Sequence, residues 1–285
     1  MSFVWGRRTY IMGILNVTPD SFSGDGLLNQ ADFVAAAVAQ AQDFAAAGAD
    51  ILDIGGESTR PGSRPVTPEE ELGRVLPVIK AVRQAVDLPV SVDTYRARVA
   101  EAALAAGANW VNDVWGLRMD PDMPGLAAQA GCPVVIMHNR SRPRDAAEAA
   151  RLGDSPPPYE YTDLLADVSR ELQSCIDLAL AKGVKQSQII IDPGLGFGKT
   201  PAQSLQLISQ LDRLKALGYP ILLGPSRKGF IGRILNLPPE ERLEGTAAAV
   251  AIGIARGADL IRVHEVRAMV RVARMSDALV RFVKS

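Results

Sequence analysis

The feature that most constrains the fold is a motif that recurs along the chain. An alanine-rich, helix-forming segment leads into Gly-Ala-Asp or Gly-Ala-Asn, at 48–50, 107–109 and 257–259, and a short apolar run follows each time. Glycine directly after a helix supplies the left-handed conformation that ends it. A short apolar run suits a strand buried on both faces. The repeat therefore predicts a parallel sheet covered by helices.

Eight apolar runs fit this pattern, and each is followed by a helical segment. We predict strands at 10–15, 51–54, 90–92, 110–114, 134–137, 189–191, 221–223 and 260–263. We predict helices at 31–47, 68–85, 95–106, 123–130, 162–182, 203–217, 240–256 and 266–283. Eight such units in 285 residues are typical of one α/β domain, a (β/α)8 TIM barrel over residues 1–285. The alternative, an open doubly wound sheet, is disfavoured because no Gly-x-Gly-x-x-Gly motif follows the first strand.

Three segments interrupt this rhythm and are predicted to be mobile loops, at about 16–30, 55–68 and 139–160. The second lacks hydrophobic periodicity and is rich in proline and glycine, and the third ends in three consecutive prolines. Long segments of this kind between regular elements often carry function.

Charge and cysteine usage narrow the class of protein. The chain has 31 basic and 32 acidic residues, so it lacks the basic excess of a nucleic-acid-binding protein. No apolar stretch is long enough to cross a membrane, and no signal peptide is evident, which predicts a cytoplasmic protein. Cys132 and Cys175 lack the spacing of a zinc site and are expected to be core residues.

Polar residues gather at the carboxyl end of every predicted strand or directly after it. In a TIM barrel the loops at the carboxyl ends of the strands build the active site. One such residue alone is usually a helix cap or a turn residue, but eight positions together predict a polar cup. Its members in chain order are Asn16, Asp53, Asp93, Asn112, His138, Asp192, Ser226 with Lys228, and Arg262 with His264.

The cup predicts a ligand with a donor-rich end and an anionic end. The carboxylates of Asp53, Asp93 and Asp192, with the amide of Asn112, offer acceptors to a flat heterocycle rich in N–H groups. A second set can hold a pyrophosphate, helped by a hard cation on Asn16. Its members are Arg60, Lys228, Arg262 and His264.

Three other features need an interpretation. The segment 194–200 nearly spells a phosphate-binding loop but has Pro193 where the pattern requires glycine, so Lys199 is expected to be a solvated loop lysine. Lys228 could form a Schiff base, although a direct substrate contact is favoured. His138 is either a site residue or a packing residue, and its sequence context does not decide between the two.

Several of these segments resemble the dihydropteroate synthase family, in order from residue 13 to residue 266. They are Gly-Ile-Leu-Asn-Val-Thr-Pro-Asp-Ser-Phe-Ser at 13–23, Asp-Ile-Gly-Gly-Glu-Ser-Thr-Arg-Pro-Gly at 53–62, Ser-Val-Asp-Thr at 91–94, Asn-Asp at 112–113, Asp-Pro-Gly-Leu-Gly-Phe-Gly-Lys at 192–199, Ser-Arg-Lys at 226–228 and Arg-Val-His-Glu-Val at 262–266. Three places depart from the family pattern: 23–26, 137–140 and Glu265.

The resemblance implies a homodimeric TIM barrel that uses Mg²⁺ and joins (7,8-dihydropterin-6-yl)methyl diphosphate to 4-aminobenzoate, giving 7,8-dihydropteroate and diphosphate by a dissociative mechanism. It implies Asn16 as the metal ligand and Asp93, Lys228 and Arg60 as catalytic residues. The implied substrate-binding residues are Thr59, Asp53, Asp93, Asn112, Met137, Asp192, Phe197, Ser226, Lys228, Arg262 and His264. Among them, Ser226 would receive the 4-aminobenzoate carboxylate, and Phe197 would pack near its ring.

Two other functions use the same barrel. A pterin-dependent methyltransferase would need the acceptor set but not the cations Arg60, Lys228, Arg262 and His264, so those cations favour the synthase. A non-catalytic pterin-binding paralogue would be expected to have lost one of the loop motifs, and each motif is present.

Overall fold

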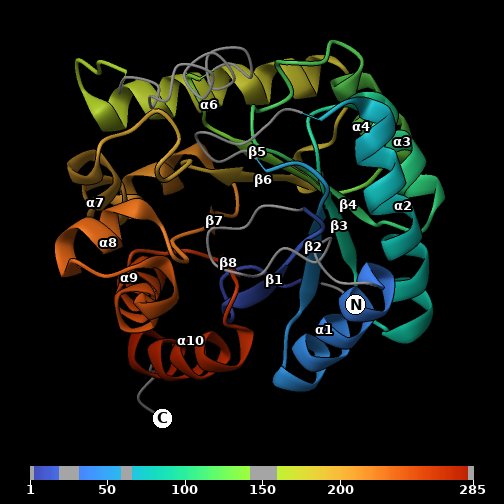
Figure 1. Ribbon diagram of the computed structural model, residues 1–285. Helices are drawn as coiled ribbons and strands as arrows, with labels where there is room; N and C mark the ends of the chain where they lie inside the picture. The colour runs from blue at the N-terminus through green and yellow to red at the C-terminus, as the bar shows by residue number, and fades with distance from the viewer. Residues whose placement is uncertain (1–2, 19–31, 59–65, 142–158, 282–285) are drawn as a thin grey trace, which may run out of the picture.

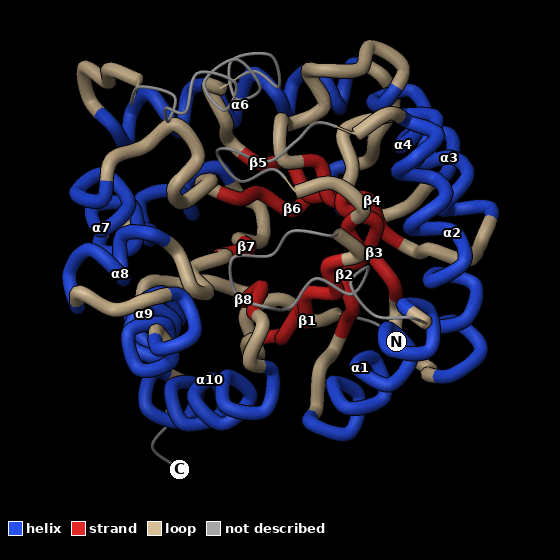
Figure 2. The backbone as a smooth tube through the Cα atoms, viewed as in Figure 1, coloured by secondary structure: helices blue, strands red, loops and turns tan. Residues whose placement is uncertain are grey.

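Eight parallel strands form the centre of the computed structural model, which describes residues 3–18, 32–58, 66–141 and 159–281. They are β1 (Tyr10–Asn16), β2 (Ile51–Gly55), β3 (Val90–Asp93), β4 (Trp110–Asp113), β5 (Val134–Met137), β6 (Ile189–Asp192), β7 (Leu222–Leu223) and β8 (Leu260–Val263). The pairing order is β6-β5-β4-β3-β2-β1-β8-β7, and a parallel bridge from Ile191 to Ile221 joins its two ends. The sheet thus closes into the predicted barrel, a ring of strands inside a ring of helices (Figure 2).

The surrounding α-helices follow the strands in order around the barrel (Figure 1). They are α1 (Phe33–Ala47), α2 (Pro68–Ala85), α3 (Ala97–Ala105), α4 (Met123–Ala130), α6 (Leu164–Ala181), α7 (Pro201–Ser209), α8 (Gly229–Leu235), α9 (Leu243–Ala255) and α10 (Val266–Val280). Short 3-10 turns lie at η2 (Gln186–Gln188), η3 (Leu211–Leu217) and η4 (Pro239–Glu241).

Side chains alternate between the inside and the outside of the barrel, because successive strand residues point to opposite faces. One residue in two packs outward against the helices, as Ile11, Leu52 and Ile261 do. The others meet inside the barrel, where apolar residues including Tyr10, Trp110 and Leu222 fill the end from which the strands begin. Among the described residues, charged side chains that face the interior, such as Asp93 and Arg262, lie toward the carboxyl ends of the strands.

The predicted strands are all present, with ends that differ by a residue or two. Two helix predictions were wrong in detail. The segment 203–217 is not one helix, because α7 ends at Ser209 and a 3-10 turn continues from Leu211. The segment after β7 begins with a short helix, α8, that the periodicity did not predict. Most of the three predicted loops, at 19–31, 59–65 and 142–158, lies outside the described residues.

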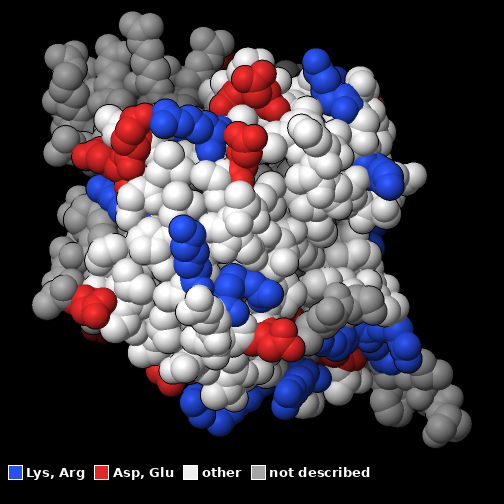
Figure 3. Space-filling view, turned by 90° about the vertical axis from the view of Figure 1, so that its right-hand side faces the viewer, with Lys and Arg blue, Asp and Glu red and all other residues white. Residues whose placement is uncertain are grey.

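Surface composition agrees with the balanced charge. On the face shown in Figure 3, lysine, arginine and carboxylate groups are interspersed, and uncharged residues separate them. None of the helices in the described ranges is long and apolar enough to span a membrane.

Candidate active site

The carboxyl ends of the strands bring the predicted acceptor residues together. Strand register sets Asp93 opposite Gly55 on one neighbouring strand and opposite Asn112 on the other. Gly55 leaves space beside Asp93, since a Cβ there would lie 3.4 Å from the Asp93 Cβ. Asn112 donates from Nδ2 to Asp53 Oδ2 at 3.0 Å. Residues far apart in the sequence thus share one polar layer inside the barrel.

Arg262 is the electrostatic centre of this layer. Its Nε donates to Asp53 Oδ2 at 2.5 Å, and its Nη2 donates to Asp93 Oδ2 at 2.8 Å. One guanidinium therefore bridges carboxylates from β2 and β3, although 209 positions separate Arg262 from Asp53. Asp53 is fully buried, and its Oδ1 has no hydrogen-bond partner, so the layer keeps one carboxylate oxygen able to accept another donor.

The neighbouring carboxyl groups are held away from water. Burial raises the pKa of Asp93, and the Arg262 guanidinium opposes that rise. Burial likewise raises the pKa of Asp192, which is opposed by the backbone N–H of Gly194 and by Lys228. Asp113, next to Asn112, accepts from the backbone N–H groups of Trp115 and Leu117, yet burial raises its pKa to about 7. Buried carboxylates with raised pKa values are a common property of functional sites.

A second polar cluster lies where β7 and β8 end. Ser226 Oγ lies 2.9 Å from His264 Nδ1 and donates to Glu265 Oε2 at 3.2 Å. The Arg227 guanidinium also forms an ion pair with Glu265. The backbone of Arg227 itself is in the left-handed region, with a φ of 56°. Glu265, one of the departures from the family pattern, therefore holds both of the residues that precede Lys228.

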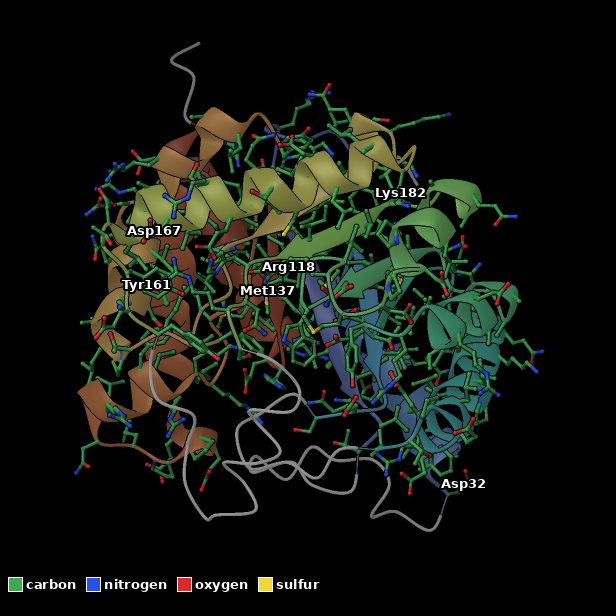
Figure 4. All side chains as sticks on the ribbon, turned by 90° about the horizontal axis from the view of Figure 1, so that it is seen from above. Asp32, Arg118, Met137, Tyr161, Asp167 and Lys182 are labelled. Atoms are coloured by element: carbon green, nitrogen blue, oxygen red, sulfur yellow. The ribbon has the colours of Figure 1, made fainter. Side chains whose placement is uncertain are left out.

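Aromatic and apolar side chains form one wall of the site. Met137, Val114 and Trp115 pack together, with Tyr95 and Phe197 against them. The ammonium of Lys228 lies 4.3 Å from the centre of the Phe197 ring, in cation–π geometry. Met137 sits well inside the molecule, beneath α6 (Figure 4). Sequence reasoning did not single out Tyr95 or Trp115, because an aromatic residue in a β/α loop is more often a core residue.

Lys199 corrects one sequence-based expectation. It is buried, not solvated, and its Nζ donates to the carbonyl oxygens of Gly194 (2.9 Å), Phe197 (3.1 Å) and His138 (3.3 Å). Gly194, Gly196 and Gly198 all have positive φ values, which turn the loop back around the lysine. Burial lowers the pKa of Lys199 to about 7, with Asp192 opposing and Lys228 reinforcing that shift.

His138 lies behind the site in a polar network with α6. Its Nε2 is 3.1 Å from Glu171 Oε2, and Arg140 also binds the Glu171 carboxylate. Burial and the nearby Lys199 lower the pKa of His138 to about 4. The imidazole is therefore neutral near pH 7 and donates from Nε2 to Glu171. This geometry favours the packing interpretation. Tyr161 and Asp167 mark this end of α6 in Figure 4.

Three of the predicted site residues are less completely placed. Thr59 and Arg60 lie outside the described residues. Asn16 is the last residue of β1 and is in register with Gly55 on β2, which is in turn in register with Asp93 on β3. In the described ranges, no group of three or more His, Cys, Asp or Glu side chains could hold a metal ion. Cys132 and Cys175 are free and buried, as expected.

Comparison with known proteins defines the class of protein to which this fold and site belong. A sequence profile for the family described as "Pterin binding enzyme" matches residues 12–264. A dihydropteroate synthase from Clostridium beijerinckii is 50% identical over 277 residues, covering 97% of this chain and 96% of that protein. One from Bacillus subtilis is 46% identical, covering 96% of this chain and 89% of that protein.

Solved structures agree. A dihydropteroate synthase from Clostridium difficile, crystallised in the presence of pteroic acid, superposes with a TM-score of 0.88 and 45% identity, covering 98% of this chain and 100% of that one. A Xanthomonas albilineans dihydropteroate synthase with 4-aminobenzoic acid has a TM-score of 0.86 and 43% identity, and the match covers 97% of this chain and 94% of that one. The chain belongs to the dihydropteroate synthase family of pterin-binding enzymes. It is accordingly an enzyme, a transferase of folate biosynthesis.

Proposed function

We propose that the enzyme condenses (7,8-dihydropterin-6-yl)methyl diphosphate with 4-aminobenzoate to give 7,8-dihydropteroate and diphosphate. The observation that carries the proposal is the buried polar layer of Asp53, Asp93, Asn112 and Arg262, with Asp192 and Lys228 at the neighbouring strand ends. Related structures support it, because the Xanthomonas albilineans enzyme was solved with 7,8-dihydropteroate as well as with 4-aminobenzoic acid.

The pterin end of the substrate matches the acceptors. A pterin ring presents an amino group beside a ring N–H, and one carboxylate can accept from both in a single plane. Asp192 is suited to this role, because only its Oδ1 is engaged by the Gly194 N–H. Asn112 can accept through its carbonyl oxygen while its Nδ2 stays bound to Asp53.

A dissociative reaction suits the remaining charges. The C–O bond between the exocyclic methylene and the diphosphate breaks first, and the leaving oxygen keeps the electron pair. The carboxylates of Asp93 and Asp53 stabilise the positive charge left on the pterin, since buried fixed charges act strongly on a developing charge. Lys228 and His264, which follow β7 and β8, are proposed to stabilise the departing anion together with Arg60.

The second step forms the C–N bond. The lone pair of the arylamine attacks the methylene cation, and the nitrogen then releases one proton to solvent or to diphosphate. An arylamine is neutral at pH 7, so no strong general base is required. The wall containing Phe197 and Met137 is suited to the aryl ring, and the Ser226 hydroxyl is suited to its carboxylate.

Mg²⁺ is part of the proposal, with Asn16 as its protein ligand. The donor set fits, because Mg²⁺ usually takes few protein oxygens and completes its shell with water and substrate phosphates. Asn16 supplies an amide oxygen at the end of β1, in register with Gly55 beside the acceptor layer. A bound Mg²⁺ would neutralise charge on the diphosphate leaving group.

We also infer a homodimer and a cytoplasmic location. Exposed apolar side chains concentrate on α9 and α10, where Ile252 is 51% exposed, Met275 59% and Leu279 69%. Burying such a face against a second copy of the chain would remove it from water.

The two free cysteines fit a reducing compartment. Light scattering tests the dimer, and cell fractionation tests the location; a monomer or a membrane-fraction enzyme would contradict them.

Two variants test the assigned roles directly. Asp93→Asn and Lys228→Ala should each lower the rate of dihydropteroate formation by about 10²-fold or more, as expected when a charge-stabilising group is removed. Both proteins should still show the circular dichroism spectrum of the folded barrel. Near wild-type turnover in either folded variant would contradict the role given to that residue.

A further inference from the structure

The proposed reaction assigns no role to Lys199, yet this lysine is buried and its ammonium contacts the main chain that follows β5 and β6. Its three N–H groups face three backbone carbonyl oxygens, those of Gly194, Phe197 and His138. An ammonium has three donors and no acceptor, so the match is complete. A surface lysine needs no such arrangement.

The carbonyls that Lys199 binds belong to the segments carrying the aryl-binding wall. Phe197 provides the ring that packs with Met137 and lies under Lys228. His138 follows Met137 directly, and its backbone N–H donates to the carbonyl of Asp192 at 2.9 Å. Lys199 therefore connects the β6–α7 loop to the end of β5 and holds the main chain on both sides of the wall.

Three glycines with left-handed backbone shape the loop around Lys199. The φ values of these residues are 70° at Gly194, 77° at Gly196 and 61° at Gly198. Glycine adopts this left-handed conformation readily but has no side chain to restrain it, so contacts from elsewhere must help to hold the loop. At Gly194 the approach to β5 is so close that a Cβ would lie 2.0 Å from the His138 carbonyl oxygen. The Lys199 ammonium supplies a hydrogen-bond donor to each of the carbonyl oxygens that this turn brings together.

We propose that Lys199 is a positioning residue for the arylamine half of the reaction, holding Phe197 against Lys228 so that 4-aminobenzoate finds a formed binding wall. The inference rests on the proposed function, because it concerns how that reaction's second substrate binds. It predicts a selective effect. Loss of Lys199 raises KM for 4-aminobenzoate while KM for the pterin diphosphate is nearly unchanged.

The protonation state of Lys199 gives a second readout. Only the ammonium has three donors, whereas the neutral amine would turn a lone pair toward a carbonyl oxygen. Burial lowers the pKa of Lys199 to about 7, and the charged groups that act on it are Asp192, Lys228, Glu171 and Arg140. His138 also faces it and is neutral in this range. KM for 4-aminobenzoate should therefore rise above pH 7 in the wild-type enzyme.

The experiment measures both KM values, and kcat, for wild type, Lys199→Met and Lys199→Gln from pH 6 to 9. Lys199→Met should raise KM for 4-aminobenzoate about tenfold, equivalent to about 1.4 kcal/mol of lost binding, and leave KM for the diphosphate within about twofold. The rise of KM above pH 7 should be absent from both variants. Lys215→Met is the matched control, since Lys215 also binds a backbone carbonyl but at an exposed position on η3.

A double-variant cycle separates positioning from general damage. If Lys199 acts through Phe197, Lys199→Met should add almost nothing to KM for 4-aminobenzoate in a Phe197→Leu background. Equal increases in both KM values, or full additivity with Phe197→Leu, would overturn the inference. If Lys199→Met does not fold, the wild-type pH profile decides, because a flat KM for 4-aminobenzoate contradicts the inference. Failure of the wild-type enzyme to form dihydropteroate would instead refute the proposed function.

Discussion

Replacing Arg262 by methionine should destabilise the barrel strongly, and the loss should grow with pH. Methionine keeps much of the apolar stem of arginine but removes the guanidinium that bridges Asp53 and Asp93. Asp53 is fully buried, and 12% of the Asp93 side chain is exposed, so two carboxylates are left in a poorly solvated layer without a countercharge. Removing one partner of a buried ion pair typically costs about 3–5 kcal/mol.

The pH dependence follows from proton linkage. The guanidinium now opposes the rise that burial imposes on the pKa of Asp93, so its removal raises that pKa further. A carboxylate with a raised folded-state pKa binds more protons folded than unfolded, and stability then falls as pH rises. We expect the variant to lose about 3–5 kcal/mol at pH 8 and about half of that or less at pH 5.

The measurement is urea unfolding followed by circular dichroism at both pH values. At pH 8 the melting temperature should also fall by roughly 6–10 °C, the shift expected for such a loss in a domain of this size. Arg98→Met is the matched control, because Arg98 pairs with Glu69 at 2.6 Å on the exposed surface. A loss no larger than in the Arg98 variant, or one independent of pH, would refute the account of this layer.

Three further variants test other parts of the structure. Hydrogen bonds from His138 and Arg140 outweigh burial and lower the pKa of Glu171 to about 2. Glu171→Gln should therefore cost about 1 kcal/mol in urea unfolding at pH 7, and the difference from wild type should shrink as pH falls from 5 to 3. Gly194→Ala should lower the free energy of unfolding by more than about 2 kcal/mol. The control Gly218→Ala should lower it clearly less, because Gly218 shares a positive φ but has no atom within 4 Å of the added Cβ. Similar losses in the two variants would contradict the close approach at Gly194. Ile252→Glu on α9 should shift the enzyme to a monomer by light scattering, whereas Val4→Glu should leave it dimeric.

The barrel was predictable because its signal is local and repeated. Each Gly-Ala-Asp or Gly-Ala-Asn motif marks a helix end next to a strand, and a closed ring of eight follows from the count. The two wrong helix predictions lie in segments where this local signal is weak. The helix α8 begins with Gly229 and contains Gly232, so helix propensity did not indicate it. The break between α7 and η3 has no marker residue, because Gln210 is compatible with either conformation.

It was easier to predict which residues line the site than which of them contact one another. Position near the carboxyl end of a strand was enough to select Asp53, Asp93 and Arg262, because parallel strands end at one edge of the barrel. Their mutual contacts join residues from β2, β3 and β8, and no local pattern carries such pairing. The burial of Lys199 is also non-local in origin. It depends on three left-handed glycines and on the His138 carbonyl, 61 positions away.

The most direct test of the central claim is diphosphate release by the purified enzyme. The enzyme would be given (7,8-dihydropterin-6-yl)methyl diphosphate and Mg²⁺, with and without 4-aminobenzoate, and both diphosphate and dihydropteroate would be measured. The account predicts sustained release only with both substrates present, and one dihydropteroate formed for each diphosphate released. Pterin binding without any release, or transfer of a methyl group in place of this condensation, would contradict it.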